Sequence, residues 1–93
     1  MNLIFTEHLK LRLKLRKIPE KYPKIIFENS EQHFFDVSEK RDIKIKRLKY
    51  NQKLRNMMIV YESKNDYIEI ITIHPISDDQ IINRIKTGRW LEK

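Results

Sequence analysis

Apolar residues recur with two different periods along this chain, and the change of period predicts strands in the middle and helices near both ends. Residues 2–5 are apolar and short, which is typical of a strand. Four further strands are predicted after residue 32: His33–Val37, Asp42–Tyr50, Asn56–Glu62 and Tyr67–His74. Asn56–Glu62 and Tyr67–His74 are apolar on both faces, so we expect them in the centre of a sheet. We expect the short strand His33–Val37 at its edge.

The alternation within Asp42–Tyr50 changes parity. Ile43 and Ile45 alternate with lysines, but Leu48 and Tyr50 take the other parity, which predicts a bulge near Lys46-Arg47. The polar run Ser63–Asp66 is a tight-turn signal and predicts a hairpin between the two central strands.

The first helix is predicted from Thr6, a favourable N-cap residue, to Arg16. Leucine also alternates with basic residues from Leu9 to Leu15, which is the period of a half-buried strand. We favour the helix, because leucine, lysine and arginine are good helix formers and the run has no β-branched residue. On a helix, Leu9 and Leu13 lie on one side and Leu11 nearly opposite.

Two more helices complete the prediction. Pro19 suits the first turn of a helix over residues 19–28, and Pro23 would shorten or kink it. The last helix begins at Ser77, with Gln80 in a capping-box position, and stops at Gly88. We therefore predict one α+β domain over residues 1–93, with an antiparallel meander of four or more strands, two N-terminal helices and one C-terminal helix.

The charge of the chain indicates what kind of partner the protein binds. Among 93 residues, 20 Lys and Arg oppose 13 Asp and Glu, and the formal charge is +7. The excess is concentrated in residues 8–24 and 40–55, which is typical of a nucleic-acid-binding protein and equally of a solvated, lysine-rich surface. No apolar run approaches the ~20 residues that span a bilayer, and residues 1–5 are too short for a signal peptide, so we expect a cytoplasmic protein.

Cysteine and glycine usage excludes two kinds of site. The chain has no cysteine, so it has neither a disulfide framework nor a thiolate metal site. Its one glycine, Gly88, rules out a glycine-rich phosphate loop. The three histidines are too far apart in sequence for a local metal motif, and we expect neither metal nor cofactor.

His8, Arg12 and Arg16 are spaced four residues apart and would form one stripe on a helix. Histidine can move protons near neutral pH, and arginine stays charged and binds two phosphate oxygens at once. These residue types suit RNA cleavage by attack of the 2′-hydroxyl, although an exposed helix face would look the same. His74, at a strand end before Pro75, is a candidate for the second proton transfer or a structural histidine.

Two further groups are candidates for RNA binding. Arg84, Arg89 and Trp90 would give a basic helix end with an exposed indole that stacks on a base, unless Trp90 packs onto the sheet instead. A basic strand surface is expected from Lys44, Lys46 and Arg47. His33 is expected to be structural or merely exposed.

Several motifs together resemble a known family. They are Phe5-Thr6-x-His8-x₃-Arg12-x₃-Arg16-x-Ile18-Pro19, the strands Met57–Tyr61 and Tyr67–Ile73, and the closing segments Gln80–Arg84 and Gly88-Arg89-Trp90. The chain resembles, over nearly its whole length, a family of small prokaryotic proteins that is similar to the BrnT and RelE-type toxins of toxin–antitoxin systems. The resemblance implies a RelE-like fold, metal-independent RNA cleavage and a cognate antitoxin. Family sequences often have glycine where this chain has Lys17.

The leading hypothesis is therefore an endoribonuclease toxin in which His8 and His74 transfer protons while Arg12 and Arg16 hold phosphate. The alternative is a non-catalytic nucleic-acid-binding or protein-interaction module of a mobile element, which uses the same charges without chemistry. A homodimer is possible if Asn56–Tyr61 lies at a sheet edge and pairs between subunits.

Overall fold

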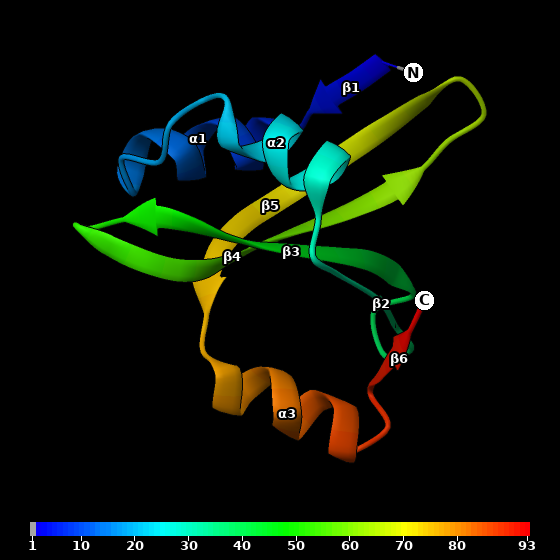
Figure 1. Cartoon of the computed structure of the whole chain (residues 1–93). Helices are drawn as coiled ribbons and strands as arrows, with labels where there is room; N and C mark the ends of the chain where they lie inside the picture. The colour runs from blue at the N-terminus through cyan, green and yellow to red at the C-terminus, as the bar shows by residue number, and fades with distance from the viewer. Residues whose placement is uncertain (1) are drawn as a thin grey trace.

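The computed structural model describes residues 2–93, which form one six-stranded sheet with helices on both faces (Figure 1). The elements in chain order are β1 (Asn2–Phe5), α1 (Glu7–Leu15), α2 (Tyr22–Asn29), β2 (Gln32–Asp36), β3 (Arg41–Tyr50), β4 (Lys53–Ser63), β5 (Tyr67–Ile76), α3 (Asp78–Lys86) and β6 (Trp90–Glu92). The order of strands across the sheet is β1-β5-β4-β3-β2-β6. Among these residues, no helix is long and apolar enough to cross a membrane.

The α+β class and the antiparallel meander are confirmed. Strands β2 to β5 pair antiparallel in sequence order, whereas β1 pairs parallel with β5 and the short β6 was not predicted. Strand β4 lies between β5 and β3, so both of its edges are occupied. The idea that Asn56–Tyr61 pairs between subunits is therefore wrong.

Two apolar cores lie on opposite faces of the sheet. Helices α1 and α2 cover one face, where Leu9, Ile26 and Ile59 are completely buried. Helix α3 and the C-terminal segment cover part of the other face, where Trp90 packs against Phe34. Figure 1 shows α1 and α2 above the sheet and α3 below it.

The two-faced core explains the parity change in β3, and the bulge predicted near Lys46-Arg47 is wrong. The register between β3 and β4 is continuous from Asp42 to Tyr50. Ile43 and Ile45 turn toward the α3 face, whereas Leu48 and Tyr50 turn toward the α1 and α2 face, because different helices cover the two ends of the strand. The irregularity of the sheet instead lies in the pairing of β4 with β5, between Val60 and Tyr61.

Helix α2 begins later than predicted. Its first residue is Tyr22, and Pro19 lies in the turn before it, where the Pro19 carbonyl accepts from the Tyr22 N–H at 3.0 Å. Pro23 then occupies the second helical position, where a missing N–H leaves no intrahelical bond unmade.

Helix α1 ends in a Schellman motif that forces Lys17 into a left-handed conformation. The Ile18 N–H donates to the Leu13 carbonyl at 2.9 Å, and the Lys17 N–H donates to the Lys14 carbonyl at 3.3 Å. The buried Ile18 side chain accompanies these bonds, as an apolar residue at this position commonly does. Lys17 has φ of 54°, so a side chain stands where glycine is free of strain.

We expect Lys17→Gly to raise the free energy of unfolding by about 1 kcal/mol, because glycine has no Cβ and adopts the left-handed conformation without steric strain. Urea unfolding measures the difference. Lys17→Ala is the matched control: alanine also has a Cβ, so its stability should stay close to that of the parent chain. Equal stabilisation by both variants would show that the lysine charge, and not the backbone, is the cause.

Candidate functional site

A pocket of about 250 Å³ lies on the α3 face of the sheet, between the central strands and the C-terminal segment. Its aliphatic lining comes from β3, β4 and β5. Its charged residues come from the end of β2, the turn after it, the start of β3, helix α3 and the segment that follows α3. The lining residues are Asp36, Glu39, Arg41, Ile43, Met58, Val60, Ile71, Thr72, His74, Arg84, Arg89 and Trp90. Four predicted site residues, His74, Arg84, Arg89 and Trp90, therefore line one cavity.

His74 lies in β5, and its hydrogen bond fixes which nitrogen is free. Nδ1 lies 3.0 Å from the Pro75 carbonyl oxygen, which can only accept, so Nδ1 carries the hydrogen and Nε2 keeps its lone pair. Burial lowers the pKa of His74 below its ordinary value, and the bond to Pro75 opposes this shift. The imidazole is therefore neutral at pH 7 and able to accept a proton at Nε2.

The arginines of α1 do not line the pocket, but their charges act on the same histidine. The positive charges of Arg16, Arg12 and Arg84 each lower the pKa of His74 further. This proximity arises because the chain leaves β1 at Thr6, whose hydroxyl donates to the Ile71 carbonyl of β5 at 2.9 Å. Helix α1 therefore runs beside β5 and brings its arginines toward His74.

The helical reading of this segment and its stripe are confirmed. Thr6 caps α1 by accepting from the Leu9 N–H, and Leu9 and Leu13 turn into the core. Nη2 of Arg12 lies 3.2 Å from Nε2 of His8, and because a guanidinium only donates, His8 is the acceptor. The His8 side chain is exposed to solvent.

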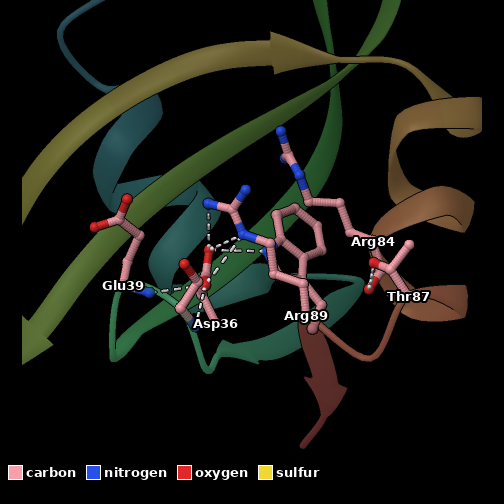
Figure 2. Close-up of polar contacts among 7 residues, drawn as sticks. Asp36, Glu39, Arg84, Thr87 and Arg89 are labelled. Carbon is pink, nitrogen blue, oxygen red and sulfur yellow. Dashed lines mark hydrogen bonds and ion pairs between the residues drawn. The ribbon is translucent and has the colours of Figure 1, made fainter.

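Asp36 is the residue that holds the rim of the pocket, and sequence reasoning missed it. Its carboxylate, 3% exposed as a residue, accepts from the Ser38 and Glu39 backbone N–H groups at 2.9 and 3.0 Å. It also accepts from Nε of Arg89 at 3.2 Å and from Nε1 of Trp90 at 3.1 Å, and Figure 2 shows these bonds converging on it. Asp36 thereby joins the turn after β2 to the segment that follows α3.

Arg84 and Arg89 differ in how their charges are compensated. Arg89 forms an ion pair with Asp36, with Nη2 at 3.1 Å from Oδ2. The Arg84 guanidinium instead lies over the Trp90 ring, 5.1 Å from its centroid, and no carboxylate in residues 2–93 is within ion-pair distance of it. Arg84 is therefore the rim cation best placed to bind an anion.

Two of the predicted RNA contacts are corrected by these positions. Trp90 is 2% exposed and stacks on Phe34, so its indole anchors the C-terminal segment and is not open to a base. The three residues do not form one basic strand surface, because Lys44 and Lys46 share one face of the sheet and Arg47 lies on the other. Lys44 also donates to the Phe27 carbonyl at 3.0 Å, away from the pocket.

His33 is structural, as one of the two expectations had it. Nε2 of His33 lies 2.9 Å from the Tyr61 hydroxyl and 3.6 Å from Oδ1 of Asp42. Lys93 donates to the same carboxylate oxygen at 2.7 Å, which ties the C-terminus to the sheet. This network lines none of the pocket.

No family model, curated protein or solved structure matches this chain. Within residues 2–93, no group of three or more His, Cys, Asp or Glu side chains is arranged to hold a metal ion. The functional assignment therefore rests on the pocket, its neutral histidine and the cations around it.

Proposed function

We propose that this protein is a metal-independent endoribonuclease that cleaves RNA in the pocket around His74, and that it acts as the RelE-like toxin of a toxin–antitoxin system. The observation that carries the proposal is a neutral, part-buried imidazole with a free Nε2, placed among three arginines. The same arrangement supplies a base and the positive charge that a phosphorane needs.

The reaction divides into two proton transfers around one phosphorus. Nε2 of His74 takes the proton of a 2′-hydroxyl, and the 2′-oxygen attacks the adjacent phosphorus. The bond from phosphorus to the 5′-oxygen breaks, and the leaving oxygen takes a proton from His8 in its protonated form or from water. The products are a 2′,3′-cyclic phosphate and a 5′-hydroxyl end, while Arg12, Arg16 and Arg84 balance the charge of the phosphorane.

The test is incubation of purified protein with labelled single-stranded RNA in EDTA, beside His8→Ala, Arg12→Gln and Lys14→Gln variants. Lys14→Gln is the matched control, because it removes the same charge from the exposed outer side of α1. We expect 2′,3′-cyclic ends from the parent chain and from Lys14→Gln, with much less product from His8→Ala and from Arg12→Gln. Uncleaved RNA with the parent chain, both free and in translating ribosomes, would contradict the proposal.

The geometry of His8 favours a second candidate function, a nucleic-acid-binding module without catalysis. Its Nε2 is occupied by Arg12 and its side chain is exposed, so His8 is not held for proton transfer. Under that function the arginines bind phosphate, no product forms and no variant changes the RNA. If the protein is a toxin, the arginines around the pocket form the surface that an acidic antitoxin would cover.

Arg84 should contribute one phosphate contact whichever function holds. We expect Arg84→Ala to reduce the slope of log affinity against log salt by about 0.7, the value for one phosphate contact on a single strand. Lys86→Ala is the matched control: Lys86 lies on the same helix and is exposed outside the pocket. Equal slopes for the two variants, measured by fluorescence anisotropy with labelled RNA, would remove Arg84 from the interface.

A further inference from the structure

We propose that the pocket beside His74 is a binding site for one nucleobase, and that the Thr72 hydroxyl selects which base binds there. The inference rests on the proposed function for the identity of the ligand as RNA. It goes further in assigning base recognition to aliphatic residues and a hydroxyl that the reaction does not use.

The interior of the pocket is apolar although its rim is charged. Ile43 and Met58 are buried beneath it, whereas Val60 and Ile71 remain partly exposed in the middle of the sheet. Leaving aliphatic side chains uncovered on a central strand is unfavourable, and a flat apolar ligand would bury them. Charged groups alone would bind a phosphate, but they give no reason for this apolar surface.

The volume of the pocket suits a small ring system. At about 250 Å³ the cavity is smaller than the roughly 300–1,000 Å³ of sites that enclose drug-sized ligands. One base fits this description better than a stack of bases. The Trp90 indole cannot stack on it, because Phe34 covers one side and Arg84 lies over the ring, so the base would lie on Val60 and Ile71.

Thr72 supplies the polar element that a base would require. Its Oγ1 is the one buried side-chain oxygen or nitrogen in residues 2–93 that has no hydrogen-bond partner. Such groups are rare in folded proteins, and a hydroxyl can both donate and accept. Thr72 lines the pocket, and a rotation of about 120° about χ1 moves its hydroxyl to the next staggered position around Cβ. The edge of a base can provide the missing partner.

The position of Thr72 also fits the geometry of a nucleotide. Thr72 and His74 lie two residues apart on the same strand, and both line the pocket with Arg84. A base over Val60 and Thr72 would therefore lie beside the charged rim, with its sugar and phosphate extending toward His74. Selection of the base and cleavage of the chain would take place in adjacent parts of one cavity.

The test is titration with the four nucleoside 3′-monophosphates and with inorganic phosphate, followed through the fluorescence of Trp90, the single tryptophan. Inorganic phosphate reports the charged rim alone. We expect one nucleotide to bind about tenfold more tightly than phosphate and than its weakest competitor. Nucleotides that bind no better than phosphate would overturn the proposal.

Three variants separate base selection from folding. Thr72→Val replaces the hydroxyl by a methyl group of similar shape and should reduce the preference to below about twofold, with phosphate binding unchanged. Thr72→Ser keeps the hydroxyl and should keep the preference, and Val60→Phe should exclude all four nucleotides by filling the pocket. An unchanged preference in Thr72→Val, with an unchanged melting temperature, would overturn the role of Thr72.

This proposal and the proposed function fail in different assays. RNA cleavage that depends on His74 but shows no base preference would support the nuclease function and overturn the nucleobase-binding site. Nucleotide selection without any cleavage would support the nucleobase-binding site and would show that the protein binds RNA without cleaving it.

Discussion

RNA cleavage should fall by about 10²–10⁴-fold in a His74→Gln variant, the contribution typical of a positioned general base. Glutamine fills a similar space and can donate to the Pro75 carbonyl, but it cannot take a proton from a 2′-hydroxyl. RNA affinity should change little, because the cations that bind phosphate are untouched. Single-turnover cleavage with saturating protein separates the chemical step from binding.

His33→Gln is the matched control for this variant. His33 is also a partly buried histidine with a lowered pKa, but it contacts Tyr61 on the other face of the sheet. Its variant should lose some stability and retain cleavage once folded. If the His33 and His74 variants cleave equally well, the base lies elsewhere.

The pH dependence of the cleavage rate is a second test of His74 as the general base. Burial lowers the pKa of His74 below its ordinary value of 6.5, and the charges of Arg16, Arg12 and Arg84 lower it further. A base must be unprotonated to act, so the acidic limb of the rate profile, which belongs to His74, should lie below pH 6.5, where the pH drops through the lowered pKa. A rate that fell between pH 8 and 7 would identify a different base.

The pattern of residues was sufficient to predict the elements that depend on local preferences. The cap at Thr6 and the capping box at Ser77 depend on neighbouring backbone, and each is present. The stripe of His8, Arg12 and Arg16 follows from helical spacing in the same way. These features require no knowledge of how distant segments pack.

The features that sequence reasoning left open or missed depend on contacts between distant segments. The burial of Trp90 and the formation of β6 require Asp36, which lies 54 positions earlier in the chain than Trp90. A basic segment with a tryptophan looks the same in sequence whether its indole is exposed or bonded to a buried carboxylate. In β3, the side to which Leu48 turns depends on which helices cover each face.

The candidate site was predicted only in part, because its residues come from distant segments of the chain. His74 and the arginines of α1 were proposed separately, and their proximity follows from the passage of α1 beside β5. Thr72 gave no signal at all, since an unpartnered hydroxyl is recognised only when every neighbouring donor and acceptor has been placed. Asp36 carried a weak signal in the Asp-Val-Ser-Glu run, whose backbone N–H groups suit an Asx turn.

Asp36→Asn should have the largest effect on stability, lowering the free energy of unfolding by about 2–4 kcal/mol. The carboxylate accepts hydrogen bonds from two backbone N–H groups, Arg89 and Trp90, and an asparagine side chain presents one oxygen in place of two. The expected loss is below that of a fully buried ion pair, because the Arg89 side chain is 38% exposed. Thermal unfolding followed by Trp90 fluorescence should show a melting temperature lower by roughly 4–8 °C per kcal/mol.

Glu39→Gln is the matched control, since Glu39 is exposed in the same turn and contributes only its backbone N–H to Asp36. Its stability should stay within about 0.5 kcal/mol of the parent chain.

The pH dependence of this difference identifies the charge of Asp36 as its cause. Burial alone would raise the pKa of Asp36, but the bonds from the Glu39 backbone, Arg89 and Trp90 outweigh it and hold the pKa below its ordinary value of 3.8. The folded chain therefore favours the ionised form, and this stabilisation is fully present above pH 3.8 and is lost as the pH falls through the lowered pKa. The gap between the parent chain and Asp36→Asn should be constant from pH 5 to 7 and should narrow below pH 4. A gap that stays constant down to pH 2 would assign the effect to the shape of the side chain and not to its charge.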